Sequence, residues 1–189
     1  MKLLAKRWSP SATDLLRADH SRVVATFHRY SSDLAPRVKL GLVGRICLAL
    51  EVHAQIEEEL FYPALRNAAP AIVEESLLQH QEMTTLIGAL RGMDADTPAY
   101  DETFFRLMRA VMHHAADEET RLFPDAERMF PEEMAERGAR MAKRRLELGL
   151  PRARELARNA ARLVPLSGLV ATAAGVLAGA LLYRRAIRR

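Results

Sequence analysis

The chain has 189 residues, of which 49% are hydrophobic and 28% charged, which fits one folded domain with an appendage. Its net charge of +4 is divided unevenly. Residues 1–150 carry 20 Lys and Arg against 23 Asp and Glu (net −3), and residues 151–189 carry 8 Arg against 1 Glu (net +7). Because a nucleic-acid-binding protein carries its basic face on the folded domain, this distribution argues against nucleic acid as a partner. The single cysteine, Cys47, excludes an internal disulfide framework and fits a reducing compartment.

The first 150 residues predict helices, because no strand-like alternation bounded by turn residues occurs and Gly is scarce. Start and stop signals predict five helical segments, over residues 13–30, 36–66, 70–91, 99–123 and 131–148. Pro63 and Pro124 are expected to kink or end the second and fourth segments. A helix of about 20 residues spans ~30 Å, so the first four segments can enclose a core. We predict an all-α fold, an up-down four-helix bundle over residues 11–130, followed by a charged helical linker, 131–162, that lies along it.

Residues 163–183 form a run of 21 residues without a charge. As a helix rising ~1.5 Å per residue, this run would span ~31 Å, close to the hydrocarbon thickness of a bilayer. Ala171, Gly175 and Gly179 recur every four positions, a spacing that lets two membrane helices approach closely. We therefore predict a single transmembrane helix over this run with a basic end at 184–189, and its small residues would allow a homodimer.

Two other structures would also suit the run, an interfacial helix and a buried helix of the soluble domain. The predicted bundle already has its four helices, so nothing remains to surround a further buried one. The first ten residues lack the apolar region of a secretory signal. We therefore expect a membrane protein with a single C-terminal pass, whose folded domain lies in the cytoplasm.

Two segments repeat one pattern 61 residues apart, HAQIEEELFYP from His53 and HAADEETRLFP from His114. On a helix, positions i and i+4 share a face, so His53 with Glu57 and His114 with Glu118 each present an imidazole and a carboxylate together. A single pair of this kind is commonly a solvated pair on a helix surface. Two pairs with matching aromatic-Pro endings are much harder to obtain by chance, and they indicate two metal ions or one site built from two helices.

The other two predicted bundle helices each carry a histidine of their own, within DLLRADH and QHQE. Bundle proteins build metal centres from side chains on facing helices that point toward a shared axis. We therefore predict a metal site whose ligands are His20, His53, Glu57, His80, His114 and Glu118.

His113 and His114 are adjacent, so on a helix they point about 100° apart and only one can face the interior squarely. His114 flanks the apolar stripe of its helix together with Glu118, whereas His113 lies nearer the side that bears charged residues. We predict that His114 is the ligand and that His113 is exposed. His28 points roughly 80° away from His20 on the same helix and is left out of the set.

Nitrogen and oxygen donors without thiolate suit iron or manganese better than structural zinc. The motifs DLLRADH, HAQIEEELFYP, QHQE and HHAADEETRLFP, in this order over residues 11–130, resemble those of hemerythrin-type (HHE cation-binding) domains. The resemblance implies a four-helix bundle with a non-haem di-iron centre, in which the six predicted residues ligate two iron ions. It also implies that dioxygen, or a related small molecule such as nitric oxide or peroxide, binds at an open iron position.

The third helix departs from the pattern of the oxygen-carrying members, which place a second histidine one turn before the ligand. Here that position is Ser76. The departure argues against reversible oxygen carriage and favours a sensor, store or scavenger at a membrane. The alternatives are a di-iron oxidase or peroxide-consuming enzyme, with Tyr62 as a candidate proton donor, and a structural stress protein that spaces the anchor from a partner.

Overall fold

A computed structural model of the protein describes residues 10–164. This part of the chain is entirely helical, with no strand between its ends. Its elements, in which η marks a π-helical turn, are α2 (Ala12–Phe27), α3 (Pro36–Ile56), η1 (Glu57–Phe61), α4 (Tyr62–Leu65), α5 (Pro70–Gly92), α6 (Pro98–Asp117), η2 (Glu118–Leu122), α7 (Phe123–Met129), α8 (Met134–Gly149) and α9 (Ala153–Leu163). The predicted all-α fold is confirmed for these residues.

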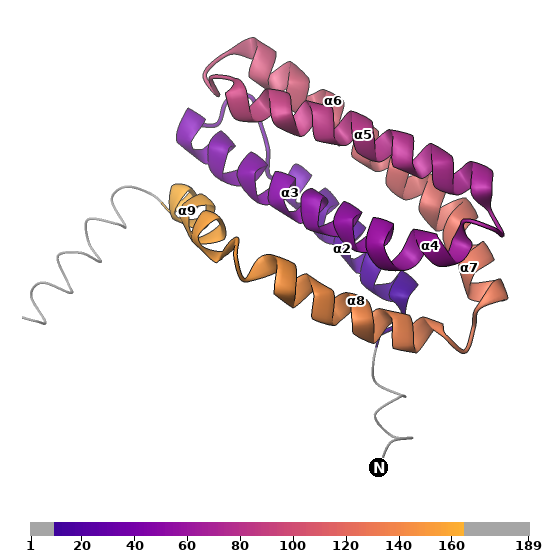
Figure 1. Ribbon diagram of the computed structural model, residues 1–189. Helices are drawn as coiled ribbons and strands as arrows, with labels where there is room; N and C mark the ends of the chain where they lie inside the picture. Colours follow the sequence, from indigo (N-terminus) through magenta and orange to yellow (C-terminus); the bar gives the residue numbers. More distant parts are fainter. Residues whose placement is uncertain (1–9, 165–189) are drawn as a thin grey trace, which may run out of the picture.

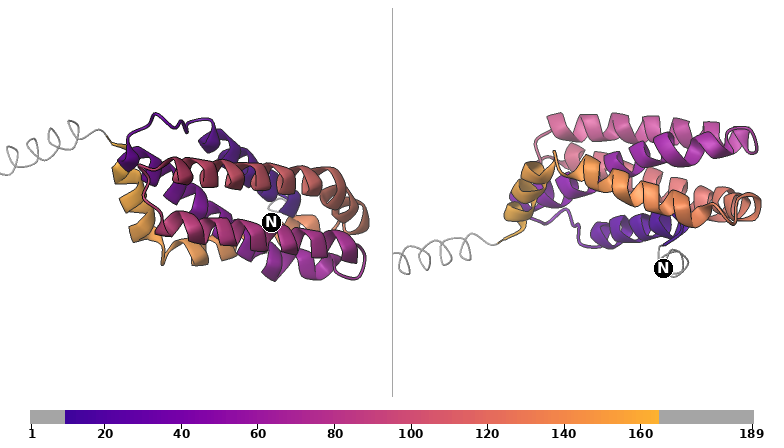
Figure 2. Two further views of the ribbon diagram at one scale, coloured as in Figure 1. Left: turned by 90° about the horizontal axis from the view of Figure 1, so that it is seen from above. Right: turned by 60° about the horizontal axis from the view of Figure 1, so that its bottom comes forward.

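The long helices α2, α3, α5 and α6 form the bundle. Figure 1 shows α5 and α6 side by side, with α2 and α3 beneath them. Figure 2 shows α8 running along the flank of the bundle, where it packs against α2 and α3, and α9 lies across the end of α3. The charged fifth segment therefore lies along the bundle, as the sequence predicts.

Local signals fix where the bundle helices begin. Ser11 caps α2, where its hydroxyl accepts from the backbone N–H of Asp14 and its own N–H donates to the Asp14 carboxylate. Pro36 and Pro70 occupy the first turn of α3 and α5, where a missing N–H costs no hydrogen bond. Thr97 caps α6 by accepting from the N–H of Tyr100.

The two prolines of the repeated motif do not end their helices. The chain continues helically past Pro63 into α4 and past Pro124 into α7. A proline inside an α-helix has no N–H to donate, and its ring clashes with the carbonyl four residues earlier. In both copies, one π-helical turn precedes the proline and shifts the hydrogen-bond spacing, a feature that is frequent at functional sites. Both turns begin at a predicted ligand, Glu57 or Glu118.

The interior consists of two apolar clusters, one at each end of the bundle. On α2, Leu16 belongs to one cluster and Val23 to the other, and His20 lies between them. On α3, Leu50 and Ile56 belong to different clusters, and His53 lies between them. Because each bundle helix passes from one cluster to the other in this way, the predicted ligands share one level, enclosed above and below by apolar side chains.

Two glycines of α3 let α9 approach closely. A Cβ on Gly44 would lie 2.6 Å from the Nδ2 atom of Asn159, and a Cβ on Gly41 would lie 2.9 Å from the backbone oxygen of the same residue. Real Cβ atoms essentially never come within 3.0 Å of such atoms. The guanidinium of Arg37 donates to two carbonyls at the C-terminal end of α9. The last described helix is therefore fixed to the bundle.

Within residues 10–164, no helix combines the length and the apolar composition that a membrane crossing requires. The predicted transmembrane helix, 163–183, and its basic end, 184–189, lie outside the described residues apart from 163 and 164.

Candidate metal centre

The structure brings all six predicted ligand residues together inside the bundle, each with at most 5% of its surface exposed. They come from different elements: His20 from α2, His53 from α3, Glu57 from η1, His80 from α5, His114 from α6 and Glu118 from η2. Ligand atoms of five of them, all but His80, lie within 4.8 Å of one another. The Nε2 atom of His80 lies 3.3 Å from the Oε2 atom of Glu57, so it adjoins the same group.

The imidazoles form two pairs. The Nε2 atoms of His20 and His53 are 3.1 Å apart, and those of His80 and His114 are 3.3 Å apart. The Oε2 atom of Glu57 lies 3.1 Å from Nε2 of His53 and 3.3 Å from Nε2 of His80, so this carboxylate contacts both pairs. The Oε2 atom of Glu118 does the same, at 3.5 Å from Nε2 of His20 and 3.4 Å from Nε2 of His114.

Each of these four histidines has a polar partner on its outward-facing nitrogen, Nδ1. The distances from Nδ1 to the partner oxygen are 2.8 Å for Glu119 with His20, 3.5 Å for Asp19 with His53, 2.9 Å for Glu58 with His80 and 2.9 Å for Gln79 with His114. A carboxylate or amide oxygen accepts, so Nδ1 carries the proton and the lone pair of Nε2 points into the site. This orientation is the one that metal-binding histidines use.

The four outward partners link the bundle helices in a ring. Each partner is the immediate neighbour, in sequence, of a predicted ligand, yet it bonds to a histidine on a different helix. Going around the bundle, a side chain of α2 accepts from the imidazole of α3, one of η1 from that of α5, one of α5 from that of α6, and one of η2 from that of α2. The four pairs are Asp19 with His53, Glu58 with His80, Gln79 with His114 and Glu119 with His20. The position of each imidazole therefore depends on how its helix packs against the next one.

Burial disfavours charge on the site residues when no cation is present. Burial raises the pKa of Glu57 to about 8, and burial together with repulsion from Glu57 raises the pKa of Glu118 well above its usual range. Burial lowers the pKa of His53 to about 4, and burial and the neighbouring imidazole of His80 lower the pKa of His114. The metal-free site therefore favours neutral imidazoles at His53 and His114 and protonated carboxyls at Glu57 and Glu118, and a bound cation would favour the carboxylate forms.

The donor set fits a metal. Glu57 Oε1 and Glu118 Oε2 are buried oxygens without a hydrogen-bond partner among the described residues, an arrangement that is costly unless a cation satisfies them. In each imidazole pair, two Nε2 lone pairs face each other at close range, which is favourable only with a cation or proton between them. Two imidazole pairs with two carboxylates that contact both pairs supply N and O donors to two positions.

Tyr62 is a site residue whose placement the sequence could not establish. Its hydroxyl donates to Oε1 of Glu118 at 2.8 Å and lies 3.3 Å from Nε2 of His80 and 3.4 Å from Oε2 of Glu57. The side chain is 1% exposed. It follows η1, whose π-helical turn shifts the register of the residues after it. The site therefore contains a phenol that can donate a proton within hydrogen-bond distance of the ligands.

The remaining histidines lie outside the site. His113 is exposed, with its Nε2 atom 3.4 Å from a carboxylate oxygen of Asp117, whereas His114 is buried. The predicted orientation of this adjacent pair is confirmed. His28 is exposed at the end of α2. Ser76, one turn before His80, is buried.

The four outward partners were not singled out from the sequence. Their only signal is that each stands beside a ligand, within the acidic runs EEE and DEE or the dipeptides DH and QH. Such runs are usually solvated surface, and the sequence does not show that they bond to neighbouring helices.

Comparison with known proteins agrees with the geometry. The sequence profile of the hemerythrin HHE cation binding domain matches residues 11–126. The DNA nickase of Nostoc sp. (strain PCC 7120 / SAG 25.82 / UTEX 2576) is 28% identical over 111 residues, which make up 58% of this chain and 32% of that protein. This chain thus spans about a third of that relative's length.

A crystal structure of a hemerythrin HHE cation binding domain-containing protein from Mycobacterium kansasii has the same fold. The TM-score is 0.65 at 21% identity, and the match covers 79% of this chain and 98% of that one. The profile match extends over more than half of the chain and includes all six predicted ligands. The chain belongs to the hemerythrin HHE cation-binding domain family.

Proposed function

We propose that this protein is a non-haem di-iron protein of the hemerythrin type that binds dioxygen or nitric oxide as a sensor, store or scavenger. One observation carries the proposal: six buried donors converge, and each imidazole has its Nδ1 proton held by an outward partner. The two imidazole pairs suit one ion each, and Glu57 and Glu118 contact both pairs. When bound, a pair of iron ions supplies an open position for a small ligand and can exchange electrons with it.

The chain's own residues prepare the site for such a ligand. Apolar clusters on both sides exclude bulk water, so a small neutral molecule is favoured over a large or charged one. The outward partners fix the imidazoles, and the Tyr62 hydroxyl, which donates to Glu118, lies within hydrogen-bond distance of His80 and Glu57 as well.

A second function, a di-iron oxidase or peroxide-consuming enzyme, is favoured by the same tyrosine. The Tyr62 phenol, hydrogen-bonded to Glu118 and adjacent to His80, can deliver a proton to a reacting oxygen. Turnover of peroxide by the iron-loaded protein, lost in Tyr62→Phe with the iron content unchanged, would favour the enzyme. Full ligand binding without peroxide turnover would favour the sensor or store.

Residues 163–183 support a location at a membrane. The run has no charged residue and ends in an arginine-rich segment, so we place the protein as a single-pass membrane protein with its iron domain in the cytoplasm. A homodimer formed through its small residues belongs to the same proposal.

Metal content tests the centre itself. Purified protein should contain about two iron ions per chain, and its absorption spectrum should change when oxygen is admitted. Glu57→Ala and Glu118→Ala should each lose most of this iron, because each removes a buried carboxylate that contacts both imidazole pairs.

The adjacent histidines provide a matched control for this test. His114→Ala should lower the iron content strongly, whereas His113→Ala, a change at an exposed position on the same helix, should leave it unchanged. Full iron loading in both glutamate variants would rule out the assignment, and absence of metal from the wild-type chain would favour a structural role.

A further inference from the structure

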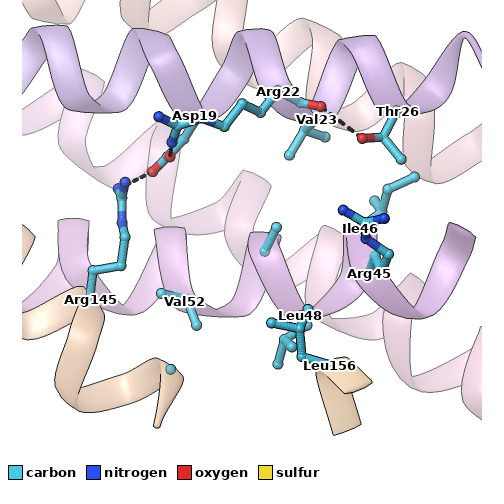
Figure 3. A pocket seen from close by; sticks show the side chains of 12 residues that line it. Asp19, Arg22, Val23, Thr26, Arg45, Ile46, Leu48, Val52, Arg145 and Leu156 are labelled. Carbon is cyan, nitrogen blue, oxygen red and sulfur yellow. Dashed lines mark hydrogen bonds and ion pairs between the residues drawn. The ribbon is translucent and has the colours of Figure 1, made fainter. Parts of the chain in front are cut away.

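A pocket of about 310 Å³ lies on the flank of the bundle where α2 and α3 face α8 and α9 (Figure 3). Small-molecule sites occupy roughly 300–1,000 Å³, so this pocket suits a small ligand. Its apolar side chains, which form the floor of the pocket, are Val23, Ile46, Leu48, Ala49, Val52 and Leu156. Leu156, which comes from α9, remains half exposed, so the apolar surface is open to solvent.

Three arginines from three helices surround this apolar floor, Arg22 of α2, Arg45 of α3 and Arg145 of α8. Asp19 is the one acid among the described residues that line the pocket. Its carboxylate accepts from Arg22 at 2.9 Å and also from Arg145, so these two charges are partly balanced. Figure 3 shows Arg45 at the opposite end of the pocket, and between residues 10 and 164 it has no ion-pair partner. The pocket carries excess positive charge above an apolar surface.

We propose that this pocket binds an aliphatic carboxylate, with the hydrocarbon chain on the apolar floor and the carboxylate against Arg45. A neutral apolar molecule would make no ion pair with the arginines, and a small inorganic anion would leave the apolar side chains of the pocket exposed to solvent. The guanidinium fork matches a carboxylate through two parallel N–H donors. At the other end of the pocket, Arg22 and Arg145 are already paired with Asp19, whereas Arg45 has no ion-pair partner between residues 10 and 164, which assigns the carboxylate to the Arg45 end.

The pocket lies next to the candidate metal centre. Asp19 forms one end of the pocket and also accepts from Nδ1 of His53. The far end of the ligand would therefore lie one side chain away from the candidate metal centre. Two walls come from α8 and α9, which lie beyond residues 11–126 shared with the family. The pocket thus depends on helices outside the residues that the family profile matches.

Calorimetric titration of the full-length protein with decanoate tests the proposal, and the metal-free form is titrated as well, so that the result does not depend on the metal. We expect one decanoate per chain in both forms and weaker binding of acetate, which lacks the chain. Arg45→Gln should weaken decanoate binding about fivefold, the upper end for a solvent-exposed ion pair, and should leave the binding of neutral decanol unchanged.

Two further variants complete the experiment. Ala49→Phe should fill the pocket and abolish binding of both decanoate and decanol, with circular dichroism confirming that the variant is folded. Arg29→Gln, at an exposed arginine outside the pocket, should bind as the wild type does. Equal decanoate affinity in Arg45→Gln and wild type would overturn the proposal. A lack of decanoate binding would overturn it as well. Vesicles of anionic lipid, added in a parallel titration, should not bind in place of decanoate, and binding of the vesicles alone would also count against the proposal.

Discussion

At the scale of single residues, the side chains beside the predicted ligands decide how firmly the imidazoles are held. Glu58 accepts from Nδ1 of His80, whereas its neighbour Glu59 points outward and pairs with Arg144. The two glutamates are adjacent, carry the same charge and are both partly exposed. Substituting each glutamate in turn therefore separates the effect of orienting the His80 imidazole from the effect of negative charge near the site.

We expect Glu58→Ala to weaken metal binding by about 10- to 100-fold, the usual cost of removing a partner that orients a metal-binding histidine. Glu59→Ala should change it by less than about threefold, because only a surface ion pair is lost. Competition against a chelator of known affinity measures both. Equal losses in the two variants would show that negative charge near the site matters and that the hydrogen bond to His80 does not.

The pH dependence of the metal-free protein follows from two buried groups. Glu57 has its pKa raised to about 8 from 4.5, so the folded state keeps a proton that the unfolded chain releases, and stability falls as the pH rises from 4.5 to 8. His53 has its pKa lowered to about 4 from 6.5, so stability also falls as the pH drops from 6.5 toward 4. The two effects oppose each other between pH 4.5 and 6.5, and above 6.5 the carboxyl effect remains.

We therefore expect the melting temperature of the metal-free protein to fall between pH 6.5 and 8. Glu57→Gln should make this fall shallower, since its amide cannot ionise, and Glu118 would account for the remainder. Metal loading should reverse the trend, because metal binding requires the deprotonated carboxylates. Thermal unfolding followed by circular dichroism, with and without a chelator, checks both statements. A flat profile in the metal-free wild type would contradict them.

At the scale of elements, the contact between α3 and α9 depends on the absence of a side chain. Gly44 and Gly88 are both inside helices, but a Cβ on Gly44 would overlap Asn159, whereas a Cβ on Gly88 would meet nothing within 4 Å. The two glycines therefore form a matched pair in which helix propensity is equal and packing differs.

Gly44→Ala should destabilise the protein by about 1–3 kcal/mol, the usual cost of overpacking a close contact. Gly88→Ala should stabilise it by about 0.5–1 kcal/mol, because alanine favours an exposed helix interior over glycine. Denaturant unfolding measures the free energy of unfolding of both variants. Stabilisation by both substitutions would show that α9 does not pack tightly against α3.

At the scale of the whole molecule, the outstanding prediction is the membrane anchor over 163–183. The full-length protein should sediment with the membrane fraction and need detergent for extraction, because an exposed apolar helix of this length aggregates in water. A chain ended after Val164 keeps α9 and its contacts with α3, so it should remain in the supernatant and still bind metal. Recovery of the full-length protein as a monomer without lipid would contradict the anchor.

The sequence determined the helices and the six residues that meet inside the bundle. Capping residues and prolines fixed where helices begin, and the spacing of four residues placed His53 with Glu57 and His114 with Glu118 on shared faces. These features depend on neighbours close in the chain, so a helix of fixed pitch suffices to predict them. The apolar stripe also separated His114 from His113, because it shows which face is buried.

Only the tertiary structure decided how separate helices meet. Tyr62 lies in the site because a π-helical turn precedes it and because α5 and η2 bring His80 and Glu118 within reach of its hydroxyl. The outward partners hold imidazoles on other helices, and the pocket beside Arg45 forms only when α8 and α9 fold back onto α2 and α3. These contacts join residues far apart in the chain, and helical periodicity carries no information about the distance between helices.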